Sequence, residues 1–499
     1  MPTLLWALPA AAALALALNR GRAAWLGPLA AGIAFVLSLT LWSHAGAMSA
    51  AEPWIGAGLA STTALHATGS LQGTIVWYRL GLSGLSLVLV ALSLLITAVA
   101  GLAGLRYGGA FVAWLTMLGA SAAGLFLARD LILFYVFWEL TLIPTYFLLV
   151  GWGGAARRAA AWKFLIYNVG GSVFLLVAVA ALAAFGVSMP GLGVAVPGAT
   201  GFAVPAAAVG PLALALFVAF AVKTPLWPVH GWVADTYSEL PAPAAALVAG
   251  VQSKAGLYGM LAILLPLLPG GVSAFGGWFI AVAMVSVLYG ALSALAAADA
   301  RRVLAYSSVS ALGLVMVALL TLQPTALSGA VLQIVAHGLF TAGLFLLIGM
   351  LESRLGGPVR LKDLSGLARH APALAGGLML LAMASLGLPG LAGFPGELMM
   401  LIGIYHYDVW LAVLGGVGLV LAAAYMLRLV QCVLHGPERA AGPSVPDLRG
   451  GERWLLAPLA LLLLFIGVFP QPIPGRVAAA VHAVVQRGGT AAQQGGRSA

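Results

Sequence analysis

The sequence predicts an all-α polytopic membrane protein with about fourteen transmembrane helices. Its 499 residues are 62% hydrophobic and only 7% charged, whereas about a quarter of the residues of a soluble protein carry a charge. The apolar segments are about 18 to 28 residues long, the length that a helix needs to cross ~30 Å of hydrocarbon. They lack the alternation of transmembrane β-strands. Glycine, proline and charged residues separate them.

The predicted spans form one membrane domain, residues 1–499. The first segment is predicted to be a retained helix and not a signal peptide, because basic residues follow it instead of preceding it. The spans cover residues 3–19, 24–44, 82–104, 110–128, 131–152, 162–186, 207–229, 241–268, 275–298, 302–322, 327–351, 375–405, 409–434 and 454–472.

Basic residues fall in alternate loops, as the positive-inside rule requires. This places both termini on the side away from the cytoplasm. The net charge of +10 is explained by this topology and not by nucleic-acid binding, because the basic residues form no single patch. The opposite loops contain Arg79 and Arg129, and the C-terminal tail adds Arg476, Arg487 and Arg497. The inner residues are Arg20, Arg22, Arg106, Arg157, Arg158, Arg301, Arg302, Arg354, Arg360, Lys362, Arg369, Arg428, Arg439, Arg449 and Arg453.

Two predicted spans contain paired prolines, which interrupt helical hydrogen bonding: KTPLWPVHG and GLPGLAGFPGEL. A shift of about 170 residues superimposes Pro225 on Pro395 and Lys163 on Gln333. The shift passes five spans, an odd number, so the two copies are predicted to be inverted. Such matching breaks indicate an ion site near the midplane of a transporter. The chain then divides into helices 1–3 (residues 1–109), a first repeat (110–268), a second repeat (275–434) and helix 14 (454–472).

Ionisable residues deep in the predicted spans are the candidate functional groups. A charge at the centre of a membrane helix costs about 3 kcal/mol even on mild insertion scales, and such residues are functional by default. The alternative is an inert buried ion pair that fixes helix packing, but two acids and two bases exceed what packing needs. The candidates are Glu139, Lys223, Lys254 and Glu397, together with His230 and His337.

Glu139 and Lys223 are predicted to form an ion pair near the middle of the membrane, because each charge lowers the cost of burying the other. If the carboxylate moves away, desolvation favours release of the lysine proton. Lys223 would then act as a switchable proton carrier. The neighbouring prolines free backbone groups for water and side chains.

His337 is predicted to relay protons between Lys254 and Glu397, because imidazole titrates near neutral pH; a lone histidine can equally be a packed core residue. Hydroxyls in AYSSVSALG offer partners for a hydrated pathway, although they can also bond their own backbone. These are Ser307, Ser308 and Ser310.

Other polar residues are weaker candidates. Asp235 and Glu239 could collect protons on the inner side, but an acidic loop that caps the next helix is the favoured interpretation. The single cysteine, Cys432, excludes a disulfide, a CxxC zinc site and an iron–sulfur cluster built by this chain alone. We therefore expect neither a metal nor a bound cofactor.

Several segments together resemble the antiporter-like membrane subunits of respiratory complex I, most closely the M-type (subunit 4) branch. The resemblance covers roughly residues 110–470. It rests on FYVFWELTLIPTYFLLVGWGG, KTPLWPVHGWVADTYSELPAPAAALVAGVQSKAGLYG, RRVLAYSSVSALG, VAHGLFTAGLFLLIGMLESR and GLPGLAGFPGELMMLIG, which follow one another in the order typical of the family.

The resemblance implies fourteen helices, two inverted five-helix repeats and proton translocation in a bacterial inner (plasma) membrane. It also implies homologous membrane subunits as partners, with NADH, FMN, iron–sulfur clusters and quinone bound by other subunits. In this family the ion pair would be Glu139 with Lys223, the central lysine Lys254, the relay His337 and the terminal acid Glu397.

One position departs from the family pattern. The family usually has a histidine where SSVSALG places Ala311. Waters held by Ser308 and Ser310 could replace the imidazole, because a hydrated pathway needs polar partners more than one particular ring. Two alternatives share most of these features: a subunit of a multisubunit sodium/proton antiporter, and a membrane subunit of an energy-converting hydrogenase. Genomic neighbours or co-purifying peripheral subunits would discriminate among them.

Overall fold

The computed structural model describes residues 2–19, 21–42, 80–185, 187, 204–436 and 445–495, the last eight of these as backbone only. Within these ranges the protein is helical, apart from turns and two isolated β-bridges, Leu80 with Ala128 and Asp299 with Arg360. The predicted loop residues Arg20, Arg79, Arg439 and Arg497 lie outside the described residues, as do the last residues of the predicted spans 24–44 and 162–186.

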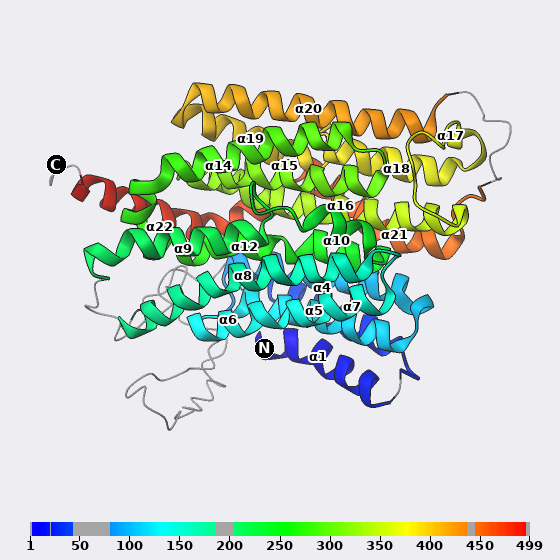
Figure 1. Cartoon of the computed structure of the whole chain (residues 1–499), viewed down its shortest axis with the longest axis horizontal. Coiled ribbons are helices and arrows are strands. Elements are labelled where there is room, and N and C mark those ends of the chain that lie inside the picture. The colour runs from blue at the N-terminus through cyan, green and yellow to red at the C-terminus, as the bar shows by residue number, and fades with distance from the viewer. Residues whose placement is uncertain are drawn as a thin grey trace.

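The helices run side by side along one direction and form an elongated bundle (Figure 1). Eleven described helical segments are long and apolar enough to cross a membrane. They comprise α4 (Gly84–Gly104, extended by η1 to Tyr107), α5 (Gly109–Leu127), α6 with α7 (Leu131–Leu140, Leu142–Trp152), α8 (Arg157–Ala184), α9 (Ala206–Lys223), α11 to α13 (Ala242–Leu267), α14 (Pro269–Ala296), α15 (Ala300–Leu320), α16 (Pro324–Leu355), α20 (Val409–Leu434) and α21 (Gly450–Val468).

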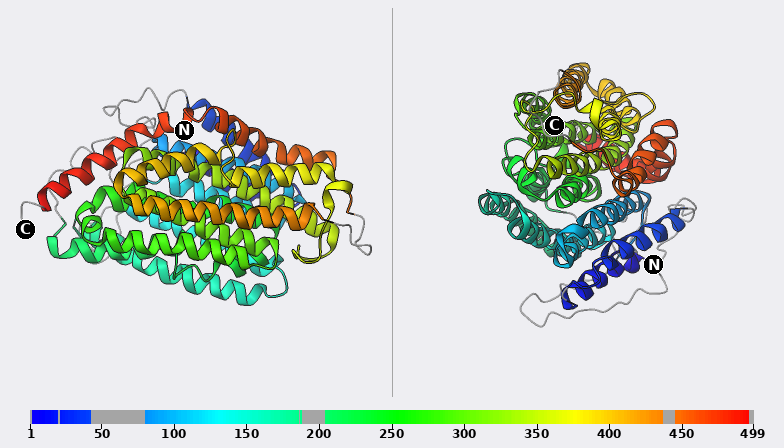
Figure 2. Two further views of the ribbon diagram at one scale, coloured as in Figure 1. Left: turned by 90° about the horizontal axis from the view of Figure 1, so that it is seen from above. Right: turned by 90° about the vertical axis from the view of Figure 1, so that its right-hand side faces the viewer.

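Shorter helices complete the bundle. The apolar α1 (Pro2–Leu18) and α2 (Leu26–Thr40) pack against α5 and α4, on the side of the bundle opposite α20 (Figures 1 and 2). The remaining ones are α10 (Val233–Glu239), α17 (Leu367–His370), α18 (Pro372–Ser385), α19 (Gly393–Tyr407) and α22 (Pro472–Gly495).

The paired prolines interrupt the helix in two of the predicted spans. The span predicted at 207–229 ends as a helix at Lys223, and a turn region leads into α10. The span predicted at 375–405 is divided into α18 and α19. Proline lacks the amide hydrogen that continues a helix. Lys223 and Glu397 therefore lie beside backbone groups that would be hydrogen-bonded to one another in a regular helix.

A third interruption surrounds Lys254. Between α11 (Ala242–Leu247) and α13 (Leu265–Leu267) the helix contains two π-helical turns, η2 (Val248–Gln252) and η3 (Met260–Leu264), which flank α12 (Lys254–Gly259). Such turns are frequently found at functional sites. The sequence predicts an uninterrupted span at 241–268, because no proline marks the π turns.

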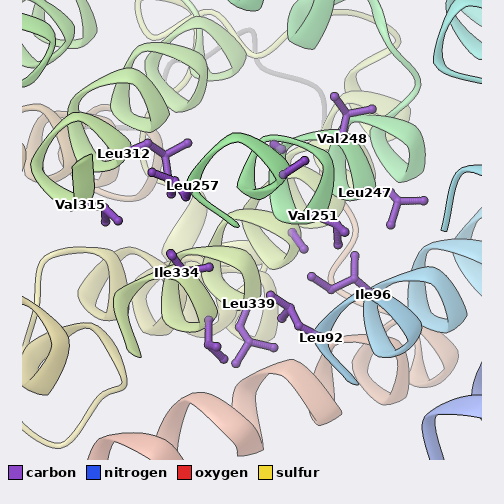
Figure 3. Packing of buried hydrophobic residues seen from close by; sticks show 14 of the residues in the cluster. Leu92, Ile96, Leu247, Val248, Val251, Leu257, Leu312, Val315, Ile334 and Leu339 are labelled. Atoms are coloured by element: carbon purple, nitrogen blue, oxygen red, sulfur yellow. The ribbon is translucent and has the colours of Figure 1, made fainter. Parts of the chain in front are cut away.

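The centre of the bundle is formed by α16 and the α11–α13 segment, in which the most apolar stretches are completely buried. Figure 3 shows Leu92 and Ile96 of α4 meeting Leu339 of α16 and Val251 of η2. Backbones approach closely at Gly250 and Gly338: a Cβ atom on Gly338 would lie 2.8 Å from the Gly250 carbonyl oxygen. Small residues allow such approaches between membrane helices, and this one brings η2 and α16 together.

The helix α22 was not predicted. It runs obliquely to the bundle axis at one end and packs on α4, α13, α14 and α16 (Figure 2). Its buried residues recur with helical spacing: Ile473, Val477, Val481 and Val484. Because its apolar residues form one face and not a continuous run, it lacks the pattern of a membrane span.

Candidate functional site

Lys223 is buried in the centre of the first half, with 1% of its surface exposed. Its ammonium group donates a 2.9 Å hydrogen bond to Thr141 Oγ1 and lies 4.8 Å from the ring centroid of Trp138. A hydroxyl oxygen and an aromatic face are both favourable neighbours for a cation. A protonated Lys223 is therefore stabilised without a carboxylate in direct contact.

The Glu139 and Lys223 side chains, predicted to form an ion pair, make no direct contact. No salt bridge joins these two described residues, and Glu139 Oε1 is buried without a hydrogen-bond partner. Lys223 instead contacts Trp138 and Thr141 of the same segment. The Glu139 carboxylate interacts with Tyr135, one turn earlier on α6.

Neutral polar side chains extend from Lys223 toward Lys254. Gln252 Nε2 donates to the Thr141 carbonyl oxygen at 3.3 Å and lies 3.4 Å from Thr141 Oγ1. Its Oε1 accepts a 3.0 Å hydrogen bond from Thr145. Gln252 is the last residue of η2, and Ser253, which follows it, contacts the Lys254 ammonium at 3.2 Å. The sequence alone does not predict this connection, because single polar residues in apolar spans form no pattern.

Lys254 and His337 meet at the centre of the bundle. Lys254 is fully buried, and its ammonium nitrogen lies 2.8 Å from His337 Nδ1. The same ammonium donates to the Ala249 carbonyl oxygen, which lies in the π turn preceding α12. Thr341 Oγ1 lies 3.3 Å from His337 Nδ1, one turn further along α16. The structure thus brings together two residues that the sequence analysis connected only by function.

Glu397 lies on α19 at the second proline break, 9% exposed. Gln333 Nε2 donates a 3.1 Å hydrogen bond to Glu397 Oε1. The other carboxylate oxygen packs against the turn at Gly387, where a Cβ atom would lie 2.1 Å from it. Gly387 has a φ of +66°, which L-residues with side chains rarely adopt. A glycine is therefore required at this turn for both its backbone conformation and its space.

A small cavity lies between His337 and Glu397. Its volume of about 20 Å³ is enough for one water molecule, which also needs two to four polar partners. Gln333 and Tyr425 also contact the cavity, and Gln333 Oε1 is a buried acceptor without a partner. Tyr425 on α20 is nearly buried and lies beside Glu397 and Ser307. Gln333 and Tyr425 were not among the predicted site residues.

The serines of α15 are divided between two environments. Ser307 and Ser310 contact the cavity, as does Ala311, where the family usually has a histidine. Ser308 does not: its hydroxyl donates to the Leu304 carbonyl oxygen within its own helix. Ser308 thus bonds its own backbone, the alternative stated for these hydroxyls, and lies outside the cavity. Ser310 donates to the Val287 carbonyl oxygen, which leaves its oxygen lone pairs as acceptors.

His230 and Asp235 lie on the turn and helix that follow Lys223. His230 is nearly buried, its Nδ1 has no partner, and its ring lies edge-on to Tyr289 at 4.9 Å. Asp235 bridges two helices: Lys163 of α8 is 2.7 Å from one carboxylate oxygen, and Arg302 of α15 is 3.7 Å from the other.

Neither Asp235 nor Glu239 caps the following helix, which corrects the favoured interpretation. Glu239 instead accepts a 2.9 Å hydrogen bond from the Ala156 amide at the start of α8. Nearby, Arg301 forms a two-pronged contact with Glu352 and also donates to the Leu240 carbonyl oxygen. These contacts hold α10, α15 and α16 together at the end of the bundle opposite α22.

No group of three or more histidine, cysteine or acidic side chains that could hold a metal ion occurs among the described residues.

Comparisons with known proteins identify the family. Residues 128–422 match the family described as NADH:quinone oxidoreductase/Mrp antiporter, TM. NADH-quinone oxidoreductase subunit M of Pseudomonas aeruginosa is 34% identical over 486 residues, 93% of this chain and 92% of that protein. Subunit M of Mycobacterium tuberculosis is 39% identical over 358 residues, 70% of this chain and 64% of that protein.

Solved structures have the same fold. A chain of respiratory complex I from Thermus thermophilus superimposes with a TM-score of 0.84 at 32% identity, covering 98% of this chain and 99% of that chain. A chain of the Mrp complex from Dietzia superimposes with a TM-score of 0.80 at 21% identity, covering 97% and 99%; this likeness concerns the fold alone. The resemblance inferred from the motifs is confirmed, and the chain belongs to the family of NADH:quinone oxidoreductase and Mrp antiporter membrane subunits.

Proposed function

We propose that this chain moves protons across the membrane as an antiporter-like subunit of an NADH-quinone oxidoreductase of the complex I type. The observation that carries the proposal is the buried polar chain from Lys223 through Thr141 and Gln252 to Lys254 and His337, and on through the small cavity to Glu397. Ionisable residues inside a membrane domain mark ion pathways.

In this mechanism a proton enters at the end of the bundle that carries Asp235 and His230. Lys223 passes it along the hydroxyl and amide groups toward Lys254, and His337 accepts it from Lys254 across 2.8 Å. A water in the cavity then bridges His337 to Glu397, because proton transfer needs groups within hydrogen-bond reach or one water apart. Glu397 releases the proton at the side of α22.

Glu139 acts at a distance in this scheme. Its carboxylate makes no direct contact with the Lys223 ammonium, which bonds Thr141 instead, so it biases the charge of Lys223 through the low-dielectric interior. A change in the side-chain conformation of Glu139 would alter that bias. This is how a signal from a neighbouring subunit would favour loading or release at Lys223.

Several finer features belong to the same proposal. The chain would comprise two inverted repeats, residues 110–268 and 275–434. In support, Lys163 and Gln333, which the repeat superimposes, each contact an acid that follows the proline break of their own half, Asp235 and Glu397. Both termini would face outward from the bacterial inner membrane. The redox groups, NADH, FMN, iron–sulfur clusters and quinone, would be bound by partner subunits.

The proposal is tested in the assembled complex, reconstituted in proteoliposomes. A Lys254→Met variant, with a side chain of similar length and no proton to transfer, is expected to lose most NADH-driven proton uptake. Lys362→Met, which removes a loop lysine, serves as the control. Proton uptake at the wild-type rate in a fully assembled Lys254→Met complex would refute the pathway. Sodium uptake that depends on Lys254 would favour the sodium/proton antiporter alternative.

A further inference from the structure

An apolar groove lies on the flank of the bundle between α2, α4, α16, α21 and the start of α22. Its volume is about 460 Å³, and every side chain that lines it is apolar. The floor consists of Leu92 and Leu339, which lie close together in Figure 3. Leu339 is midway along α16, so the groove reaches the depth of the central residues. It is separate from the cavity beside His337.

The rim of the groove remains open. Leu39, Phe465 and Phe469 line it, and between 45% and 60% of their surfaces is exposed. Such a hydrophobic hollow in a membrane-spanning bundle is accessible to the apolar interior of the bilayer.

One end of the groove carries a cation. Pro472 and Ile473 of α22 close this end, and Arg476 lies one turn further on the same face of α22. The Arg476 guanidinium lies 5.9 Å from the ring centroid of Trp42, which also lines the groove. No described carboxylate forms a salt bridge with Arg476.

We propose that this groove binds one membrane phospholipid, with an acyl chain against Leu92 and Leu339 and the phosphate at Arg476. The arrangement matches the two ends of such a molecule: apolar walls along the membrane axis, and an arginine with an interfacial tryptophan at the end of the bundle. Tryptophan is enriched at membrane interfaces, and arginine attracts anionic lipid head groups.

The lining favours an acyl chain over a helix from a neighbouring subunit. The lining residues of α4, from Val88 to Leu95, extend about 11 Å along the helix axis at 1.5 Å per residue. The lining leads to the Arg476 guanidinium at one end, and a phospholipid has the matching pair of an apolar chain and an anionic head group. An acyl chain is thin and adapts to an irregular wall.

The experiment uses the assembled complex in vesicles of phosphatidylethanolamine and phosphatidylglycerol that contain a trace of phosphatidylglycerol with a diazirine near the end of one acyl chain. After illumination, labelled peptides are mapped by mass spectrometry. We expect labelling of α4 near Leu92 and of α21 near Phe465. Arg476→Gln is expected to reduce this labelling about fivefold, the effect of losing one head-group cation. Ala91→Phe fills the groove and is expected to abolish it.

Two variants control for charge and bulk. Arg487→Gln removes a charge about three turns further along α22, and Val413→Phe adds a ring to the exposed face of α20; both are expected to leave the labelling unchanged. Equal labelling of the wild type and of both groove variants would show bulk lipid contact only and would overturn the proposal. So would unlabelled α4 and α21 peptides in the wild-type complex, because a protein segment would then fill the groove.

Discussion

The ammonium nitrogen of Lys254 lies 2.8 Å from Nδ1 of His337, and this contact joins the two halves of the chain. The contact depends on the close approach of Gly250, four residues before Lys254, to Gly338, which follows His337. These glycines allow η2 and α16 to pack backbone to backbone. Any larger side chain at either glycine would separate the Lys254 ammonium from the His337 ring. The polar connection across the centre of the bundle is thus a consequence of local helix packing.

Glu397 is expected to be essential as a group that gains and loses a proton. Glu397→Gln keeps the size of the side chain and its hydrogen bond with Gln333 but cannot cycle, so NADH-driven proton uptake should fall to a small fraction of the wild-type value. Asp408→Asn, which removes an exposed acid from the loop after α19 and keeps its capping hydrogen bond, is the control. Wild-type stoichiometry in an assembled Glu397→Gln complex would leave Glu397 with a structural role only.

Thr141 is expected to hold the charged form of Lys223. Thr141→Val removes the hydroxyl that accepts the 2.9 Å hydrogen bond and leaves a buried ammonium beside an aromatic ring only. Hydrogen bonds to buried charged groups contribute about 2 kcal/mol, so the thermal stability of the complex and its pumping should both decrease. Thr141→Ser, which retains the hydroxyl, should restore both; a Ser variant as defective as the Val variant would contradict this role.

Tyr425 is expected to be a positioning residue for water in the cavity beside Glu397. Tyr425→Phe removes one polar partner from the cavity without changing the packing of the ring. The loss of a hydrogen bond of about 1 kcal/mol corresponds to about a fivefold lower rate of proton uptake. The KM for quinone should not change, because Tyr425 acts on the proton pathway. Unchanged proton uptake at all pH values would show that the hydroxyl serves packing alone.

Asp447 is expected to make the loop before α21 sensitive to acid. Partial burial raises the pKa of this carboxyl. Hydrogen bonds from the amides of Ala373, Leu374 and Leu448, together with the charge of Arg453, lower the pKa by more than burial raises it. The pKa of Asp447 therefore lies below its ordinary value. A depressed folded-state pKa contributes stability above the unfolded value of about 3.9, and this contribution disappears as the pH falls through the folded pKa.

Hydrogen exchange of residues 372–376 as a function of pH measures this effect, because Asp447 caps the first turn of α18. Protection should be constant near neutral pH and decrease below about pH 4. Asp447→Ala should lower the stability of this turn by about 1 kcal/mol at neutral pH. Asp447→Asn keeps an acceptor and should remove the pH dependence. A pH-independent wild type, or an Asp447→Asn variant that keeps the wild-type pH profile, would contradict the prediction.

The sequence by itself determined the class of protein, most of the spans and the family. These follow from properties that act along the chain: continuous apolar length, loop charges and motifs such as the paired prolines. Burial of Lys223, Lys254, His337 and Glu397 could also be predicted, because charged or titratable residues stand out in apolar segments. The helix α22 escaped prediction, since an amphipathic surface helix lacks a continuous apolar run.

The tertiary structure decided which side chains meet. Thr141, Gln252, Gln333 and Tyr425 are neutral residues whose importance depends on the neighbours that packing brings to them. Helix packing placed the Thr141 hydroxyl on the Lys223 ammonium and the Glu139 carboxylate beside Tyr135, although Glu139 and Thr141 are only two residues apart. A linear pattern records how deep a residue lies in the membrane, whereas the direction of its side chain follows from the packing of that helix against all the others.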